Sequence, residues 1–125
     1  MEDRVVMMAM RFIRDQALGG CSVDDVLQHV RVSRTSLERK FRQHLNRSPQ
    51  TEIRAVQMRR AKELLIGTDF TLEHIAGLCG FEHPEYMSVM FKRIYQQTPG
   101  EYRKAHSKQF KAKPSQRKLK PYNFL

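Results

Sequence analysis

The sequence predicts an all-α fold of about seven helices, built as two similar halves joined by a long central helix. One pattern occurs twice, at 22–49 and at 71–99: a capping hydroxyl, a short apolar helix, a tight break, a longer helix, and Ser-Pro or Thr-Pro. Phe41 and Phe91 hold equivalent places in the two copies, 50 positions apart. Apolar residues recur at helical spacing throughout, which favours helices over strands.

The first half is expected to contain three helices. Apolar residues at helical spacing predict a helix over about 4–18, which Gly19-Gly20 would end. Ser22, followed by Asp25 three positions later, resembles a capping box and starts a second helix. Ser33 can cap a third helix, in which Leu37, Phe41 and Leu45 recur every four residues.

The central helix is predicted over about 49–66. Ser48-Pro49 is a start signal, since proline suits the first helical position, and Gly67 would end the helix. Thr71 then caps a fifth helix and Gly80 permits a turn. A sixth helix would start near Pro84, and a short seventh would run from Thr98-Pro99 to about 106.

Several large side chains are expected in the core. Leu78 joins the apolar pattern of the fifth helix, and Ile94 is expected to face inward from the sixth. The other expected core residues are Leu37, Phe41, Leu64, Leu65, Ile75, Tyr86, Met87, Met90 and Phe91. We expect one domain over 1–106, with a first unit at about 4–47, a linker helix at about 49–66, a second unit at about 69–106, and a basic tail at 107–125.

Composition excludes several classes of protein. Two cysteines do not make a disulfide framework, so a reducing cytosol is expected. No apolar run is long enough to span a membrane, and no arrangement of nucleophile, base and acid can be argued, so we expect neither a membrane protein nor an enzyme. His74, Cys79 and His83 lack a fourth ligand for zinc, so no metal and no cofactor is expected.

Charge separates the two copies of the pattern. The net charge of +10 suggests nucleic acid as a partner. Residues 31–60 hold nine basic and two acidic side chains, whereas residues 69–101 hold two basic and five acidic ones. After Glu101 there are eight basic residues and no acid. The tail could add phosphate contacts or could be a solubilising end.

A short helix, a turn and a longer helix form the helix-turn-helix pattern, and two copies imply two elements that read double-stranded DNA. At the level of individual residues, the chain resembles the AraC/XylS family of bacterial transcription regulators over about 5–105. The resemblance rests on Arg59-x-Ala61-x-x-Leu64-Leu65, Thr68, Ile75-Ala76-x-x-x-Gly80-Phe81, Tyr86, Phe91-Lys92 and Thr98-Pro99-x-x-Tyr102-Arg103. Val32-Ser33-Arg34-x-x-Leu37-Glu38-x-x-Phe41 looks most like the xylose-operon regulators within the family.

The resemblance implies two helix-turn-helix units on a long rigid helix, each reading the major groove on one face of DNA. A helix of about 18 residues is roughly 27 Å long, and successive grooves on one face lie about 34 Å apart, or 10–10.5 base pairs. The resemblance also implies a larger regulator that contacts RNA polymerase and whose effector domain is not in this chain. The likeness to the xylose-operon regulators implies that this effector is a sugar. A natural stand-alone regulator is the alternative, and in either case we expect the protein in the bacterial cytoplasm, at the nucleoid.

By motif position, the resemblance assigns these residues to DNA: Arg34, Thr35, Glu38, Arg39, His83, Pro84, Glu85, Ser88, Val89 and Lys92. We add Arg42, together with Ser33 and Ser36, which lie near the start of the third helix and can bond phosphate. Arg39 could bond a guanine edge and Glu38 could accept from cytosine N4, whereas Val89 could contact a thymine methyl. The alternatives stay open. Glu38 could instead pair with Arg34 or Arg42 along the helix, and Lys40 and Arg42 could bind phosphate or solvent.

The second copy departs from the family, with Met87 where an aromatic residue is common and Gln97 near an expected glycine-bearing break. Its acidic balance leaves a rival interpretation, in which only the first copy contacts DNA and the second binds a protein.

Overall fold

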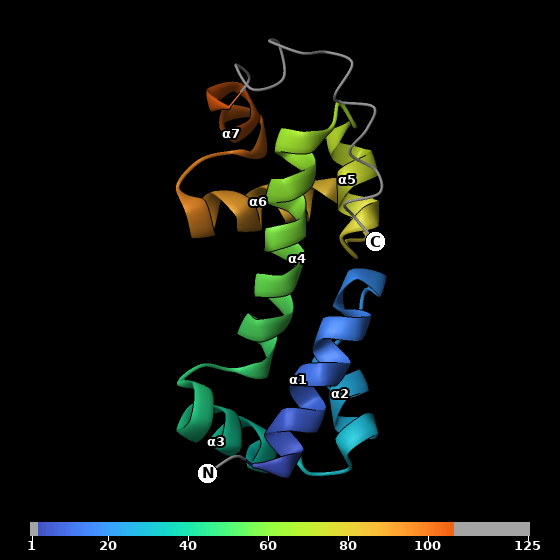
Figure 1. The fold of residues 1–125 in the computed structure, drawn as a ribbon, viewed down its shortest axis with the longest axis vertical. Coiled ribbons are helices and arrows are strands. Elements are labelled where there is room, and N and C mark those ends of the chain that lie inside the picture. The colour runs from blue at the N-terminus through green and yellow to red at the C-terminus, as the bar shows by residue number, and fades with distance from the viewer. Residues whose placement is uncertain (1–2, 107–125) are drawn as a thin grey trace. The chain divides into compact units, whose positions relative to one another are not determined.

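The computed structural model describes residues 3–106, and within them it consists of helices without strands (Figure 1). The α-helices are α1 (Arg4–Gln16), α2 (Val23–Val30), α3 (Arg34–Leu45), α4 (Pro49–Gly67), α5 (Leu72–Leu78), α6 (Pro84–Tyr95) and α7 (Pro99–Ala105). A 3-10 helix, Ala17–Gly19, follows α1. The predicted all-α class is confirmed. The predicted tail at 107–125 lies outside the described residues.

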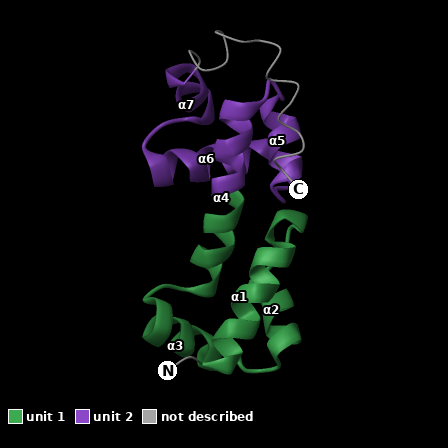
Figure 2. Ribbon diagram, in the orientation of Figure 1, with its two compact units in different colours: residues 1–57 green, residues 58–125 purple. Residues whose placement is uncertain are grey.

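The chain divides into two compact units, residues 1–57 and 58–125, and the division falls inside α4 (Figure 2). Each unit has its own buried core. Ile53, from the first part of α4, belongs to the core of the first unit, whereas Met58 and Leu65 belong to that of the second. Helix α4 is therefore more than a linker, because each of its two parts completes a core.

In the first unit, α1 packs against both α2 and α3 (Figure 1). Ile13 of α1, Val26 of α2, and Leu37 and Phe41 of α3 are all fully buried. Burying side chains of this kind stabilises a fold by roughly 1.5–3 kcal/mol each. The positions of α2 and α3 are thus fixed by apolar contacts on one face, which leaves their opposite faces to solvent.

The predicted helix starts are confirmed by hydrogen bonds. The Ser22 hydroxyl accepts from the Asp25 amide at 3.2 Å, and the Asp25 carboxylate accepts from the Ser22 amide at 2.8 Å, which completes the capping box. Ser33 accepts from the Ser36 amide at 3.1 Å and Ser48 from the Thr51 amide at 3.1 Å. Each cap satisfies an amide that the helix itself leaves unpaired.

The second unit buries Leu64 and Leu65 of α4, Ile75 of α5, and Met87 and Phe91 of α6. The rings of Tyr95 and Tyr102 flank Phe91, with centroids 4.7 and 5.5 Å away. Arg103 of α7 closes the end of α4. It donates to the Leu65 carbonyl at 3.0 Å and to the Thr68 carbonyl at 3.2 Å, and so pairs carbonyls that a helix end leaves unsatisfied.

Three predicted core positions are wrong. Tyr86, Ile94 and Leu78 are 45%, 44% and 43% exposed. On α6, Ile94 comes seven residues after Met87 and so lies on nearly the same side of the helix, yet it is exposed near the end of α6, where Tyr95 and not Ile94 packs against Phe91. Leu78 ends α5, and it is Cys79, at the turn that follows, that enters the core.

Candidate nucleic-acid interface

The turn between α2 and α3 sets the direction of α3. Arg31 ends α2 with a left-handed backbone (φ 59°), a conformation that non-glycine residues seldom adopt. Its amide still donates to the Leu27 carbonyl at 2.8 Å. Ser33 then starts α3 in an extended conformation. The equivalent turn after α5 uses Gly80 (φ 89°), so the predicted role of this glycine is confirmed.

The exposed face of α3 carries most of the residues that the sequence assigns to DNA. Ser33, Arg34, Thr35, Glu38, Arg39 and Arg42 are exposed, and Ser36 is half-buried. Residues three and four apart are neighbours on a helix surface, so Thr35, Glu38, Arg39 and Arg42 form one continuous strip. Leu37 and Phe41, on the opposite side, hold that strip outward.

Arg34 is already engaged within the first unit. Its guanidinium donates to Asp24 of α2 at 2.6 Å, and it lies 3.9 Å from the Glu38 carboxylate. The pairing of Glu38 with Arg34, one of the two alternatives for Glu38, is therefore present in this structure. All three side chains are at least half exposed, and such surface pairs contribute little stability. Arg34 and Glu38 are therefore only weakly held by these contacts.

Lys40 does not belong to the exposed strip, which corrects the expectation that it binds phosphate or solvent. Its ammonium donates to the Asp3 carboxylate at 2.7 Å, and only 28% of the side chain is exposed. Asp3 also caps α1 by accepting from the Val5 amide at 2.8 Å. Lys40 therefore joins α3 to the start of α1.

The second helix-turn-helix has a different surface. His83, Glu85, Val89 and Lys92 are exposed, while Pro84 and Ser88 are half-buried. His83 begins α6 without a side-chain cap, and Pro84 takes the first position of the helix, where its missing amide proton costs nothing. Val89 is 54% exposed, more than any other large apolar side chain among the described residues. The sequence missed Tyr86 as a surface residue because its regular spacing with buried neighbours resembled that of the core.

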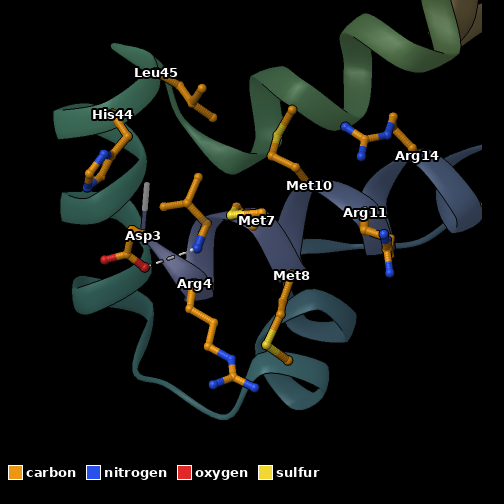
Figure 3. A pocket seen from close by; sticks show the side chains of 10 residues that line it. Asp3, Arg4, Met7, Met8, Met10, Arg11, Arg14, His44 and Leu45 are labelled. Carbon is orange, nitrogen blue, oxygen red and sulfur yellow. Dashed lines mark hydrogen bonds between the residues drawn. The ribbon is translucent and has the colours of Figure 1, made fainter. Parts of the chain in front are cut away.

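A hollow of about 740 Å³ lies beside α1 in the first unit. Figure 3 shows Met7, Met8, Met10, Arg4, Arg11 and Arg14 along it, with His44 and Leu45 nearby on α3. Among its lining residues the one carboxylate is Asp3, which Lys40 already holds. The hollow thus offers mainly thioethers and cations.

No group of three or more His, Cys, Asp or Glu side chains is placed to hold a metal ion in the described part of the chain. His74, considered above as a ligand, lies against Phe70, with ring centroids 4.3 Å apart and the rings tilted by 33°. Cys79 is fully buried, and burial raises the pKa of its thiol to about 12. Among the helices of residues 3–106, none is both long and apolar enough to cross a bilayer.

Comparison with known proteins agrees with this geometry. Residues 26–105 match the model of a helix-turn-helix domain family. The xylose operon regulatory protein of Escherichia coli K12 is 36% identical over 105 residues, which make up 84% of this chain and 27% of that protein. The chain thus spans about a quarter of the length of this relative.

Two solved structures are similar. That of a xylose-binding transcription activator has a TM-score of 0.69 at 35% identity, covering 84% of this chain and 28% of that one. The DNA-binding domain of AdpA, a global transcriptional factor solved in complex with a target DNA, has a TM-score of 0.76, covering 90% of this chain and 98% of that one. At 22% identity this second likeness concerns the fold alone. The family match and the fold together show that the chain belongs to the AraC/XylS family of helix-turn-helix DNA-binding domains of transcription regulators.

Proposed function

We propose that this chain places a bacterial transcription regulator at its promoter by inserting α3 and α6 into two successive major grooves of double-stranded DNA. The observation that carries the proposal is the exposed strip of α3. Its polar and cationic side chains project from a helix whose other face is locked into a core. A helix presented in this way fits the major groove.

The residues of the strip divide into two roles. Arg39 has two parallel donors that match the O6 and N7 acceptors of guanine, and Glu38 can accept from a cytosine or adenine amine. Arg42, one turn further along, suits a phosphate, as do Ser33, Thr35 and Ser36 near the helix start, where backbone amides also point outward. Arg34 reaches DNA once it leaves Asp24.

On α6, the proposed contacts are made by His83, Pro84, Glu85, Ser88, Val89 and Lys92. Lys92 is the exposed cation that corresponds to Arg42. Glu85 would repel phosphates, so it must meet a base amine or stay outside the groove. We therefore assign less of the affinity to α6 than to α3.

Selection from a random-sequence pool tests this proposal. We expect enrichment of a site with two boxes whose centres lie about 10 base pairs apart. Inserting half a helical turn between the boxes should then reduce binding to that of one box. If no sequence is enriched, specific DNA binding by this chain is refuted.

For the whole protein, we propose a sugar-responsive regulator of the bacterial cytoplasm, in which a separate effector domain controls this one and RNA polymerase is the partner at the promoter. The xylose regulators that the chain resembles support a sugar as the effector. Reporter transcription that is unaffected by any pentose or hexose in cells carrying the natural gene would contradict the sugar assignment.

A second function has its own support. Tyr86, Val89, Ile94 and Leu78 are exposed apolar side chains of the second unit, and residues 69–101 carry five acids against two basic residues. Both features suit a protein partner, so the alternative is that only the first unit contacts DNA. A footprint confined to one major groove would favour this alternative.

A further inference from the structure

The two helix-turn-helix units can be aligned residue by residue through their buried side chains. Leu37 and Phe41 are fully buried on α3, and Met87 and Phe91, 50 positions later, are fully buried on α6. Because the buried residues fix how each helix is turned about its axis, positions 50 apart occupy equivalent places on the two exposed faces. Val89 therefore stands where α3 presents Arg39.

This replacement changes what α6 can recognise. Arg39 can read a guanine edge, whereas an aliphatic side chain has no donor or acceptor for any base. In the major groove the apolar feature of a base is the C5-methyl group of thymine. Val89 is 54% exposed, so its two methyl groups are available for such a contact.

The neighbours of Val89 on the helix surface are also suited to a thymine–adenine pair. Tyr86, three residues earlier, is adjacent on the helix surface and is 45% exposed, although its ring also lies 6.0 Å from that of Phe81. Glu85, four residues before Val89, can accept from the N6 amine of adenine. An apolar pair beside an acceptor matches the methyl and the amine that a thymine–adenine pair exposes in the major groove.

We infer that Val89, supported by Tyr86, makes α6 a reader of thymine methyl groups, so that the second box of the DNA site is marked by thymine. This inference rests on the proposed function, since it requires α6 to enter a major groove. Each unit then has its own specificity. The first unit recognises bases through hydrogen-bond donors, and the second recognises them through apolar contact.

Substitution of deoxyuridine for thymidine is the test, because it removes the methyl group and leaves every hydrogen-bonding group of the base unchanged. The probe is the site selected from random DNA, with each thymidine of the second box replaced in turn. We expect about fourfold weaker binding at one or two positions, as for the loss of one buried methyl group. With the Val89→Ala chain the preference for thymidine over deoxyuridine at those positions should become clearly smaller, because alanine is shorter and has one methyl group where valine has two.

Two controls separate the contact from a structural effect. Ile94 lies on the same helix and is 44% exposed, but it is turned well away from Val89, so the Ile94→Ala chain should keep the fourfold preference for thymidine. Unfolding temperatures of the Val89→Ala and wild-type chains should agree, because an exposed side chain supports little packing.

The outcomes distinguish the inference from the proposed function. If a two-box motif is selected and the wild-type chain binds thymidine and deoxyuridine equally, methyl reading is overturned while DNA binding stands. If the preference persists unchanged in the Val89→Ala chain, the assignment to Val89 is overturned. Selection of a single-box motif would overturn the inference together with two-groove binding.

Discussion

The Asp3 carboxylate ties the beginning of α1 to the middle of α3, because it accepts from Lys40 at 2.7 Å while also accepting from the Val5 amide at 2.8 Å. One acid thus caps one helix and anchors the helix that we propose reads DNA. Lys40 directly follows Arg39 of the exposed strip in sequence, yet it has a structural role. The contact gives Lys40 a role in holding α1 and α3 together, whereas Arg39 stays exposed and available to a ligand.

The Asp3–Lys40 pair makes the stability of the first unit depend on pH. The hydrogen bond from Lys40 holds the pKa of Asp3 below its ordinary value of 3.8. The stabilisation is therefore fully present above that value and is lost as pH falls through the lowered pKa of the folded state. We expect the Lys40→Met chain to unfold at a lower temperature than wild type at pH 7, and the difference to vanish well below pH 3.8. Circular dichroism melts across this range test it.

The Asp3→Asn chain is the matched control, because asparagine can still cap α1 but cannot form the ion pair. In an Asp3→Asn chain, adding Lys40→Met should therefore not change the unfolding temperature at any pH. DNA selection with the Lys40→Met chain should yield the same sequences as selection with the wild-type chain. Different selected sequences would show that Lys40 contacts bases.

Arg39 and Arg42 should respond differently to truncation. Arg39→Ala is expected to cost about 1–3 kcal/mol on the selected site and to relax the preference at one base position of the first box. Arg42→Ala should weaken binding about equally on all sequences and lower the salt slope by about one. Titrations at several salt concentrations, on the selected site and on single-base variants, measure both. Uniform weakening by Arg39→Ala would make Arg39 a phosphate contact.

Arg103 should matter for the second unit through its two carbonyl partners. Removing hydrogen bonds from a charged donor costs about 1.5–3 kcal/mol, so Arg103→Ala should lower the free energy of unfolding by about that amount. Arg103→Lys should recover only part of it, since a lysine lacks the fork that reaches both Leu65 and Thr68. Urea unfolding provides the measurement. Equal stability of the Lys and wild-type chains would contradict the two-carbonyl role.

The two cysteines should react at different rates. Burial raises the pKa of the Cys79 thiol to about 12 and also raises the pKa of Cys21, which is half-buried. The thiolate is the nucleophile, and Cys79 is in addition fully inaccessible. At pH 8 a maleimide should therefore label Cys21 well before Cys79, as followed by mass spectrometry. In strong denaturant both should react alike, and rapid labelling of Cys79 in the folded chain would contradict its burial.

Helix starts and the paired architecture could be predicted from sequence because they depend on neighbours in the chain. A cap such as Ser22 with Asp25 involves residues three apart, and a turn glycine such as Gly80 is demanded by local backbone geometry. The exposure of Arg39 and Arg42 also follows from periodicity, given Leu37 and Phe41 on the other face. These features need no knowledge of distant contacts.

The errors arose where a helix face could be chosen in more than one way. On α6, Ile94 and Tyr95 are adjacent in sequence, and only packing against Phe91 placed Tyr95 inward and Ile94 outward. Tyr86 likewise fits an apolar pattern but lies at the surface. Lys40 appeared equivalent to the neighbouring arginines until its contact with Asp3, 37 positions away, was known.

By itself, then, the sequence determined the all-α class, the two helix-turn-helix units, the family resemblance and the strip of polar residues on α3, since helix periodicity and caps are short-range properties. Tertiary structure alone decided which charged groups are held by partners, as for Lys40 and Arg103, and which apolar groups remain outside, as for Tyr86 and Ile94. The physical reason is that burial and ion pairing depend on which elements meet in space, and residues far apart in the chain make those contacts.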